Sequence, residues 1–337
     1  MNEKQFKILS IDGGGIRGII PAQLLSNIEK ELTQESGNEV NLYDYFDLIT
    51  GTSTGGIIAI ALGLGMKASD MVTLYSQNAN KIFGNSNSIF RKLSKAKYDI
   101  SVLENLLIEN FKKVSTDNTE PILDDSKTRL CIPTFDGYNG TNIIRKTKHH
   151  KDLNTDYKIK AHKIALSTSA APTFFNPYTS LKGVKMINHI DGGVFANNPS
   201  LIGLTEALGA LEIPIDNVKL LSIGTGTSNY SEQKTNKNFG MVYWLNKQRI
   251  IEMFMQTQSE AIHNYVNILG KGIGGKKENS FYYKRIQHEF NSGNSIKLDA
   301  TATEDLKKLS HIGDNFYKKH GVDIINEFFQ NKVKLYK

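Results

Sequence analysis

The residues Gly51-Thr52-Ser53-Thr54-Gly55 occupy a predicted strand-to-helix turn. Residues 45–50 before them are rich in apolar and β-branched side chains, and residues 56–62 after them form an apolar, helix-like run. The spacing G-x-S-x-G at such a turn is typical of a serine that is held out of a sheet for nucleophilic attack. Gly51 and Gly55 permit close approach of neighbouring backbone, and the positive end of the following helix would face the serine. The pattern predicts acyl transfer with Ser53 as the nucleophile.

A second glycine motif, Asp12-Gly13-Gly14-Gly15-Ile16-Arg17-Gly18, lies between a predicted strand at 6–12 and a predicted helix at 21–33. Consecutive glycines leave backbone N–H groups unshielded, which can form a concavity for negative charge. Beside Ser53, the N–H groups of Gly13, Gly14 and Gly15 would receive the oxyanion of a tetrahedral intermediate. Arg17 would add a fixed positive charge near a substrate phosphate.

The same motif also permits a different interpretation, because Gly13, Gly15 and Gly18 match the dinucleotide-binding pattern G-x-G-x-x-G. That pattern requires an acidic residue at the end of the second strand to hold a ribose hydroxyl. Here the second predicted strand runs directly into Ser53 without an acid. A non-catalytic nucleotide-binding protein is therefore the less favoured alternative.

The third motif is Asp191-Gly192-Gly193, which follows the strand-like residues 186–190. A carboxylate at the end of a strand can project into a shared cleft and act as the base for Ser53 when burial adjusts its pKa. A turn-forming Asp-Gly would have the same local sequence. His189 would face the same side of a regular strand as Asp191, which leaves a Ser-His-Asp triad as a variant mechanism.

Length, composition and charge indicate the compartment and the kinds of partner that we expect for the protein. The 337 residues suffice for a sizeable core, and a single cysteine fits a reducing compartment. The polar start of the chain lacks the apolar region of a secretory signal, and we expect no transmembrane helix, so a cytoplasmic protein is predicted. The net charge of +7 suits an anionic membrane or a phosphate-bearing ligand. No motif for binding a nucleic-acid polymer is present.

Strand-like and helix-like segments alternate along the chain, which predicts one α/β domain over residues 1–337. The motifs lie within 6–226, and 239–337 is expected to be a helical C-terminal elaboration that contains one strand candidate at 281–287. The polar residues 84–88 and the glycine- and lysine-rich residues 270–279 are candidate moving segments.

Taken together, the three motifs resemble the patatin-like phospholipase family in their order and in their placement at strand ends. Residues 167–175, STSAAPTFF, also look like a family block that precedes the aspartate. The resemblance implies a three-layer α/β sandwich with a mostly parallel central sheet and helices on both faces. It implies a Ser53–Asp191 dyad, an oxyanion hole at Gly13, Gly14 and Gly15 with Arg17 nearby, and hydrolysis of membrane phospholipid esters without a metal or another cofactor. The other glycines of the three motifs are Gly18, Gly51, Gly55, Gly192 and Gly193.

A narrower resemblance concerns residues 7–21, the compact length and the helical last third, which look like bacterial patatin effectors of anti-phage signalling. In those proteins a cyclic dinucleotide activates a lipase that damages the host membrane. The resemblance implies a cyclic dinucleotide ligand and peripheral association with the inner face of the membrane, and it leaves the oligomeric state open. One alternative is a constitutive lipase. Another is an inert storage or interaction protein, and the intact Ser53 and Asp191 argue against that one.

Overall fold

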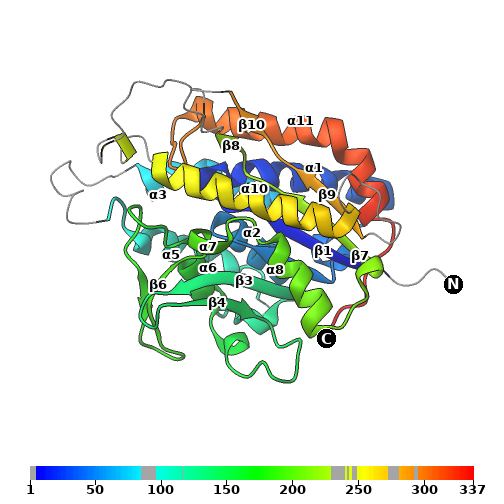
Figure 1. The fold of residues 1–337 in the computed structure, drawn as a ribbon, viewed down its shortest axis with the longest axis horizontal. Helices are drawn as coiled ribbons and strands as arrows, with labels where there is room; N and C mark the ends of the chain where they lie inside the picture. The colour runs from blue at the N-terminus through cyan, green and yellow to red at the C-terminus, as the bar shows by residue number, and fades with distance from the viewer. Residues whose placement is uncertain are drawn as a thin grey trace.

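The computed structural model describes residues 5–84, 96–115, 117–228, 240, 243–244, 249–271, 281–291 and 295–337. Most of the two candidate moving segments, 84–88 and 270–279, lies outside the described residues. Figure 1 shows a central sheet with helices in front of it and behind it.

The central sheet has the strand order β5-β6-β3-β2-β1-β7-β9, and β4 pairs with β3 off this path. The pairs along β3-β2-β1-β7-β9 are parallel, whereas β4 and β6 run antiparallel to β3, and β5 runs antiparallel to β6. The strands are β1 (Phe6–Ile11), β2 (Leu48–Gly51), β3 (Arg129–Asp136), β4 (Thr141–Lys146), β5 (Tyr178–Ser180), β6 (Met186–Asp191), β7 (Val218–Ile223) and β9 (Tyr282–Ile286). A separate parallel pair is formed by β8 (Thr227–Ser228) and β10 (Glu289–Phe290).

Helices cover both faces of the sheet because its central strands are apolar on both sides. On β1, Leu9 belongs to the larger core with α1, α2, α3, α6 and α11, while Ile8 belongs to a smaller core with α8 and α10. The helices are α1 (Ile19–Ser36), α2 (Thr54–Leu64), α3 (Ala68–Phe83), α5 (Ile100–Lys112), α6 (Ala161–Ser169), α7 (Gly193–Ala196), α8 (Ser200–Thr205), α10 (Arg249–Lys271) and α11 (Thr303–Phe328). The predicted three-layer α/β fold is confirmed.

Strands β2 and β6 share one edge of β3. Both β4 and β2 pair with Cys131, and both β4 and β6 pair with Thr134, so β4 occupies the opposite edge from each of them. Because β2 is parallel and β6 antiparallel to β3, their C-terminal ends point toward each other. The ends, Gly51 and Asp191, therefore converge near Pro133, and this brings the second and third motifs together.

The C-terminal third is more than a helical elaboration. Its strand β9, the expected strand candidate, extends the sheet beside β7, and its last helix α11 packs along α1. Figure 1 shows α10 in yellow across the front of the sheet and α11 beside α1. Among the described residues, no helix is long and apolar enough to cross a membrane.

Candidate active site

Ser53 sits at the N-cap of α2 in a conformation that side chains rarely adopt, with φ 55° and ψ −125°. The turn is tight: a Cβ on Gly51 would lie 2.1 Å from the carbonyl oxygen of Gly55. A Cβ on Gly55 would lie 2.3 Å from the carbonyl oxygen of Ile11. Both glycines are thus required by close backbone approach, and the strained serine projects from the end of β2 as the motif predicts.

The side chains of Ser53 and Asp191 are hydrogen-bonded. Ser53 Oγ donates to Asp191 Oδ2 at 2.6 Å, and the backbone N–H of Gly193 donates to Asp191 Oδ1 at 2.7 Å. Burial raises the pKa of Asp191 to about 7, although both hydrogen bonds oppose that shift. The carboxyl group can therefore accept and return a proton near neutral pH.

Thr168 fixes the backbone of Ser53. Its Oγ1 accepts a hydrogen bond from Ser53 N at 3.1 Å and donates one to the carbonyl oxygen of Pro133 at 2.6 Å. Gly192 N donates to the carbonyl oxygen of Thr168 at 3.3 Å. One threonine of the 167–175 block thereby links the serine turn, β3 and the aspartate turn.

The three consecutive glycines are not equivalent. Gly13 N donates to the carbonyl oxygen of Asn197 at 3.0 Å, so its N–H is unavailable to an oxyanion, contrary to the prediction. In the described part of the chain, the N–H groups of Gly14 and Gly15 have no hydrogen-bond partner. Gly15 has φ 56°, and a Cβ there would lie 2.3 Å from the carbonyl oxygen of Leu298. The available backbone donors are therefore those of Gly14 and Gly15.

The side chain of Arg17 does not support an oxyanion role. Its Nη2 pairs with Glu252 Oε1 at 3.1 Å, its Nε donates to the carbonyl oxygen of Ile296 at 2.5 Å, and its guanidinium stacks on Phe290. Arg17 lines a small cavity that includes Gly14 but not Ser53. Its charge is used to attach α10 to the glycine loop, a role that the motif alone does not reveal.

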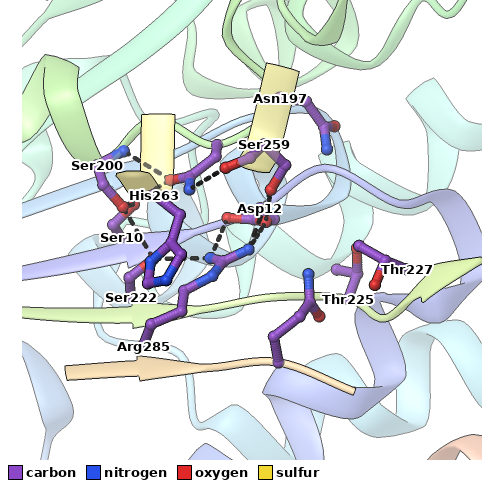
Figure 2. Close-up of polar contacts among 12 residues, drawn as sticks. Ser10, Asp12, Asn197, Ser200, Ser222, Thr225, Thr227, Ser259, His263 and Arg285 are labelled. Atoms are coloured by element: carbon purple, nitrogen blue, oxygen red, sulfur yellow. Dashed lines mark hydrogen bonds and ion pairs between the residues drawn. The ribbon is translucent and has the colours of Figure 1, made fainter. Parts of the chain in front are cut away.

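A buried ion pair joins Asp12, the first residue of the glycine motif, to Arg285 (Figure 2). Arg285 of β9 donates to both carboxylate oxygens of Asp12, at 2.8 Å and 2.5 Å, and Ser259 of α10 donates to Asp12 Oδ2 at 3.1 Å. Arg285 also donates to Ser222 on β7 at 2.7 Å. The first residue of the glycine motif is thus held by two elements of the C-terminal third.

Ser53 and Asp191 open into a cavity of about 430 Å³. Gly14 and Gly15 line it together with the serine, and α10 contributes Ile250, Ile251, Phe254 and Met255. The other apolar lining residues are Ile57, Tyr75, Ile82, Phe83, Leu103, Ala171, Pro172, Phe174, Phe175, Val194 and Leu298. An apolar cavity that contains a serine hydroxyl bonded to a carboxylate suits an ester with a long hydrocarbon chain.

His189 has a different environment from the dyad. Its Nε2 lies 3.4 Å from Arg145 Nη2, and burial together with the Arg145 charge lowers its pKa. His189 is not part of the lining of the Ser53 cavity, whereas Asp191 contacts Ser53 directly. The geometry favours the dyad over the triad.

The dinucleotide interpretation of the glycine motif also disagrees with the geometry. The Leu298 carbonyl oxygen accepts from Ile16 N at 2.8 Å and occupies the side of Gly15 on which a Cβ would stand. In the dinucleotide-binding pattern that side is left open for the pyrophosphate. A Cβ on Gly18 would lie 2.2 Å from Thr54 Oγ1, so this glycine serves contact between the two motifs.

Comparison with known proteins agrees with this geometry. The sequence profile described as patatin-like phospholipase matches residues 9–203. Patatin-like protein 2 of Arabidopsis thaliana is 33% identical over 93% of this chain and 83% of its own length. The chain belongs to the patatin-like phospholipase family, whose members are lipid-hydrolysing esterases.

Two bacterial relatives bear a more specific name. A protein of Vibrio cholerae named cGAMP-activated phospholipase is 36% identical over 68% of this chain and 66% of its own length. A protein of Escherichia coli with the same name is 29% identical over 93% of this chain and 89% of its own length.

Proposed function

We propose that this chain hydrolyses the acyl esters of membrane phospholipids with Ser53 as nucleophile and Asp191 as general base. The observation that carries the proposal is the 2.6 Å hydrogen bond between Ser53 Oγ and Asp191 Oδ2 at the base of the apolar cavity. Family membership supports the reaction class.

The reaction follows from these positions. Ser53 Oγ attacks the ester carbonyl carbon while its proton passes to Asp191, and the N–H groups of Gly14 and Gly15 stabilise the oxyanion. The intermediate collapses by breaking the bond to the alkoxyl oxygen of the lysophospholipid, which takes the proton from Asp191. Water then attacks the acyl-enzyme, Asp191 accepts its proton and returns it to Ser53, and the fatty acid leaves.

Substrate would enter from a bilayer surface. Val194 and Phe254 line the cavity and yet are 50% and 62% exposed, so the cavity has an apolar rim. Together with the net charge of +7, this rim supports peripheral association with an anionic membrane, which we place at its cytoplasmic face.

We further propose that a cyclic dinucleotide activates the enzyme and that it acts in anti-phage defence. The names of the relatives from Vibrio cholerae and Escherichia coli support this regulation. A constitutive lipase is the alternative, and the same experiment distinguishes the two.

The test is release of fatty acid from phosphatidylglycerol–phosphatidylethanolamine vesicles by wild type, Ser53→Ala and Asp191→Asn, each with and without a panel of cyclic dinucleotides. We expect hydrolysis by wild type with one messenger and losses of 10³-fold or more in both variants. Full activity of Ser53→Ala would refute the mechanism. Activity of wild type that is independent of every messenger would retain the mechanism and remove the regulation.

A further inference from the structure

The neighbouring residues Asn197 and Asn198 are both buried, but only one of them uses its side chain within the protein. Asn198 Oδ1 accepts from Ser200 N at 3.0 Å and from Ser200 Oγ at 2.6 Å, and its Nδ2 donates to the carbonyl oxygen of Ser259 at 3.3 Å. Asn197 Oδ1 is buried and has no hydrogen-bond partner among the described residues, and Asn197 as a whole is 5% exposed. Figure 2 shows the Asn197 side chain apart from the dashed contacts.

The backbone of Asn197 is held firmly, so its unpaired side chain is not a sign of a loose segment. Its N–H donates to Gln258 Oε1 of α10, and its carbonyl oxygen accepts from Gly13 N. A buried carboxamide without a partner is unfavourable, and in folded proteins such groups are rare. A partner from outside the chain would explain why this one is retained.

The carboxamide faces the reacting groups. A Cβ placed on Gly13 would be 2.5 Å from Asn197 Oδ1 and 3.2 Å from Ser53 Cβ, so one small volume adjoins both side chains. A Cβ on Gly193 would lie 3.0 Å from Asp191 Oδ1 and 3.5 Å from Asn197 Oδ1. Asn197 also lines the same cavity as Ser53 and Asp191.

The chemistry of the substrate determines which end of the amide it can use. An ester carbonyl, its oxyanion and a phosphodiester contain only acceptors, so they can bind the Nδ2 hydrogens and not Oδ1. Oδ1 is the atom that lies nearest Gly13 and Gly193 in the structure, so binding such an acceptor requires the carboxamide to turn over and exchange its two ends. On its other side, Asn197 borders a polar cavity of about 20 Å³ together with Thr225 and Gln287. That volume holds about one water molecule, which can donate to Oδ1 when Nδ2 faces the substrate.

We propose that Asn197 is a catalytic residue whose side-chain N–H group stabilises the oxyanion together with Gly14 and Gly15. The backbone N–H of Gly13 is bonded to the Asn197 carbonyl oxygen and cannot bind the oxyanion. In this role the side-chain N–H of the same asparagine takes the place of that donor. The proposal rests on the function proposed above, in which Ser53 forms the acyl-enzyme.

The test compares Asn197→Ala and Asn197→Asp with the matched control Asn198→Ala. The readouts are kcat and KM for p-nitrophenyl butyrate, the rate of Ser53 labelling by a fluorophosphonate probe, and the thermal unfolding midpoint. We expect Asn197→Ala to lower kcat and the labelling rate about 10²-fold or more, with little change in KM and no loss of thermal stability. Asn197→Asp should be at least as impaired, because it replaces the donor with a charge that repels the oxyanion.

The control should show the opposite behaviour. Asn198→Ala removes the acceptor for the buried N–H of Ser200 and one donor to the Ser259 carbonyl oxygen, so we expect a lower unfolding midpoint with kcat within about threefold of wild type. A kcat and a labelling rate of Asn197→Ala within threefold of wild type would refute the role of Asn197 while leaving the Ser53 mechanism intact. Absence of Ser53-dependent labelling in wild type would instead refute the mechanism on which the role rests.

Discussion

Gly51 and Asp191 are the last residues of two strands that lie on the same edge of β3 and point toward each other. This arrangement places the serine turn after Gly51 against the carboxylate of Asp191 without any intervening residue. The Asp191 carboxylate reaches Ser53 Oγ directly at 2.6 Å, so the proposed dyad needs no imidazole between the two groups.

The strained backbone of Ser53 predicts different stabilities for two substitutions that both remove the hydroxyl. Both Ser53→Ala and Ser53→Gly should abolish hydrolysis, but only glycine adopts φ 55° and ψ −125° without steric cost. Ser53→Gly should therefore be more stable than Ser53→Ala by about 1 kcal/mol. Chemical denaturation of the two variants measures the difference, and equal stabilities would contradict the strain.

The raised pKa of Asp191 predicts a pH-dependent stability. With a pKa of about 7 in the folded state, against about 4 in an unfolded chain, the folded state binds more protons between these values. The ionisation of Asp191 therefore lowers the free energy of unfolding as pH rises from 4 to 7, and its effect is constant above that range. We expect Asp191→Asn to raise the free energy of unfolding by roughly 2–4 kcal/mol at pH 8, and the gain should shrink toward pH 4. If the difference in free energy of unfolding between Asp191→Asn and wild type did not vary with pH, the raised pKa of Asp191 would be wrong.

The bridging hydroxyl of Thr168 predicts an effect on catalysis through positioning. Thr168→Val removes the acceptor for Ser53 N and the donor to Pro133 at nearly constant shape, which should cost roughly 1–3 kcal/mol of stability and lower kcat. Thr168→Ser keeps the hydroxyl and is the matched control. Equal kcat values in the two variants would show that this hydroxyl does not position the nucleophile.

The buried ion pair between Asp12 and Arg285 predicts non-additive substitutions. Arg285→Met leaves a buried carboxylate without its cation and should cost about 3–5 kcal/mol. Asp12→Leu combined with Arg285→Met should recover part of that loss, since no charge is then left unpaired. A double-mutant cycle on the free energy of unfolding measures the coupling, and strict additivity would mean that the pair is not formed.

His189 provides a test of the dyad against the triad. Its contact with Arg145 and its absence from the cavity lining predict that His189→Ala retains most of kcat, whereas Asp191→Ala loses hydrolysis. Steady-state hydrolysis of p-nitrophenyl butyrate compares the two. If His189→Ala lost activity while Asp191→Ala kept it, His189 and not Asp191 would be the base.

The local motifs predicted the parts of the site that depend on short-range geometry. Ser53 on a strand-to-helix turn and Asp191 at a strand end follow from the spacing of glycines and apolar residues. The fold class followed from the alternation of elements, and the strand candidate at 281–287 appears as β9.

Pairings between distant segments could not be predicted in this way. Arg285 lies 273 residues from Asp12, and no pattern around it indicates a partner. Arg17 was expected near the oxyanion because of its position in the motif, but Glu252 on α10 holds it elsewhere. Asn197 follows the Asp191 motif closely, yet its significance becomes visible only beside Asn198, whose side chain is fully paired.

The ion pair also joins two residues that are translated far apart in time. Residues 9–203 include Ser53 and Asp191, but the cation that holds Asp12 is on β9 and is translated later. A chain still on the ribosome would carry both members of the dyad beside a glycine loop without its anchor. We expect the glycine loop to become ordered only after β9 has been translated and has left the ribosome.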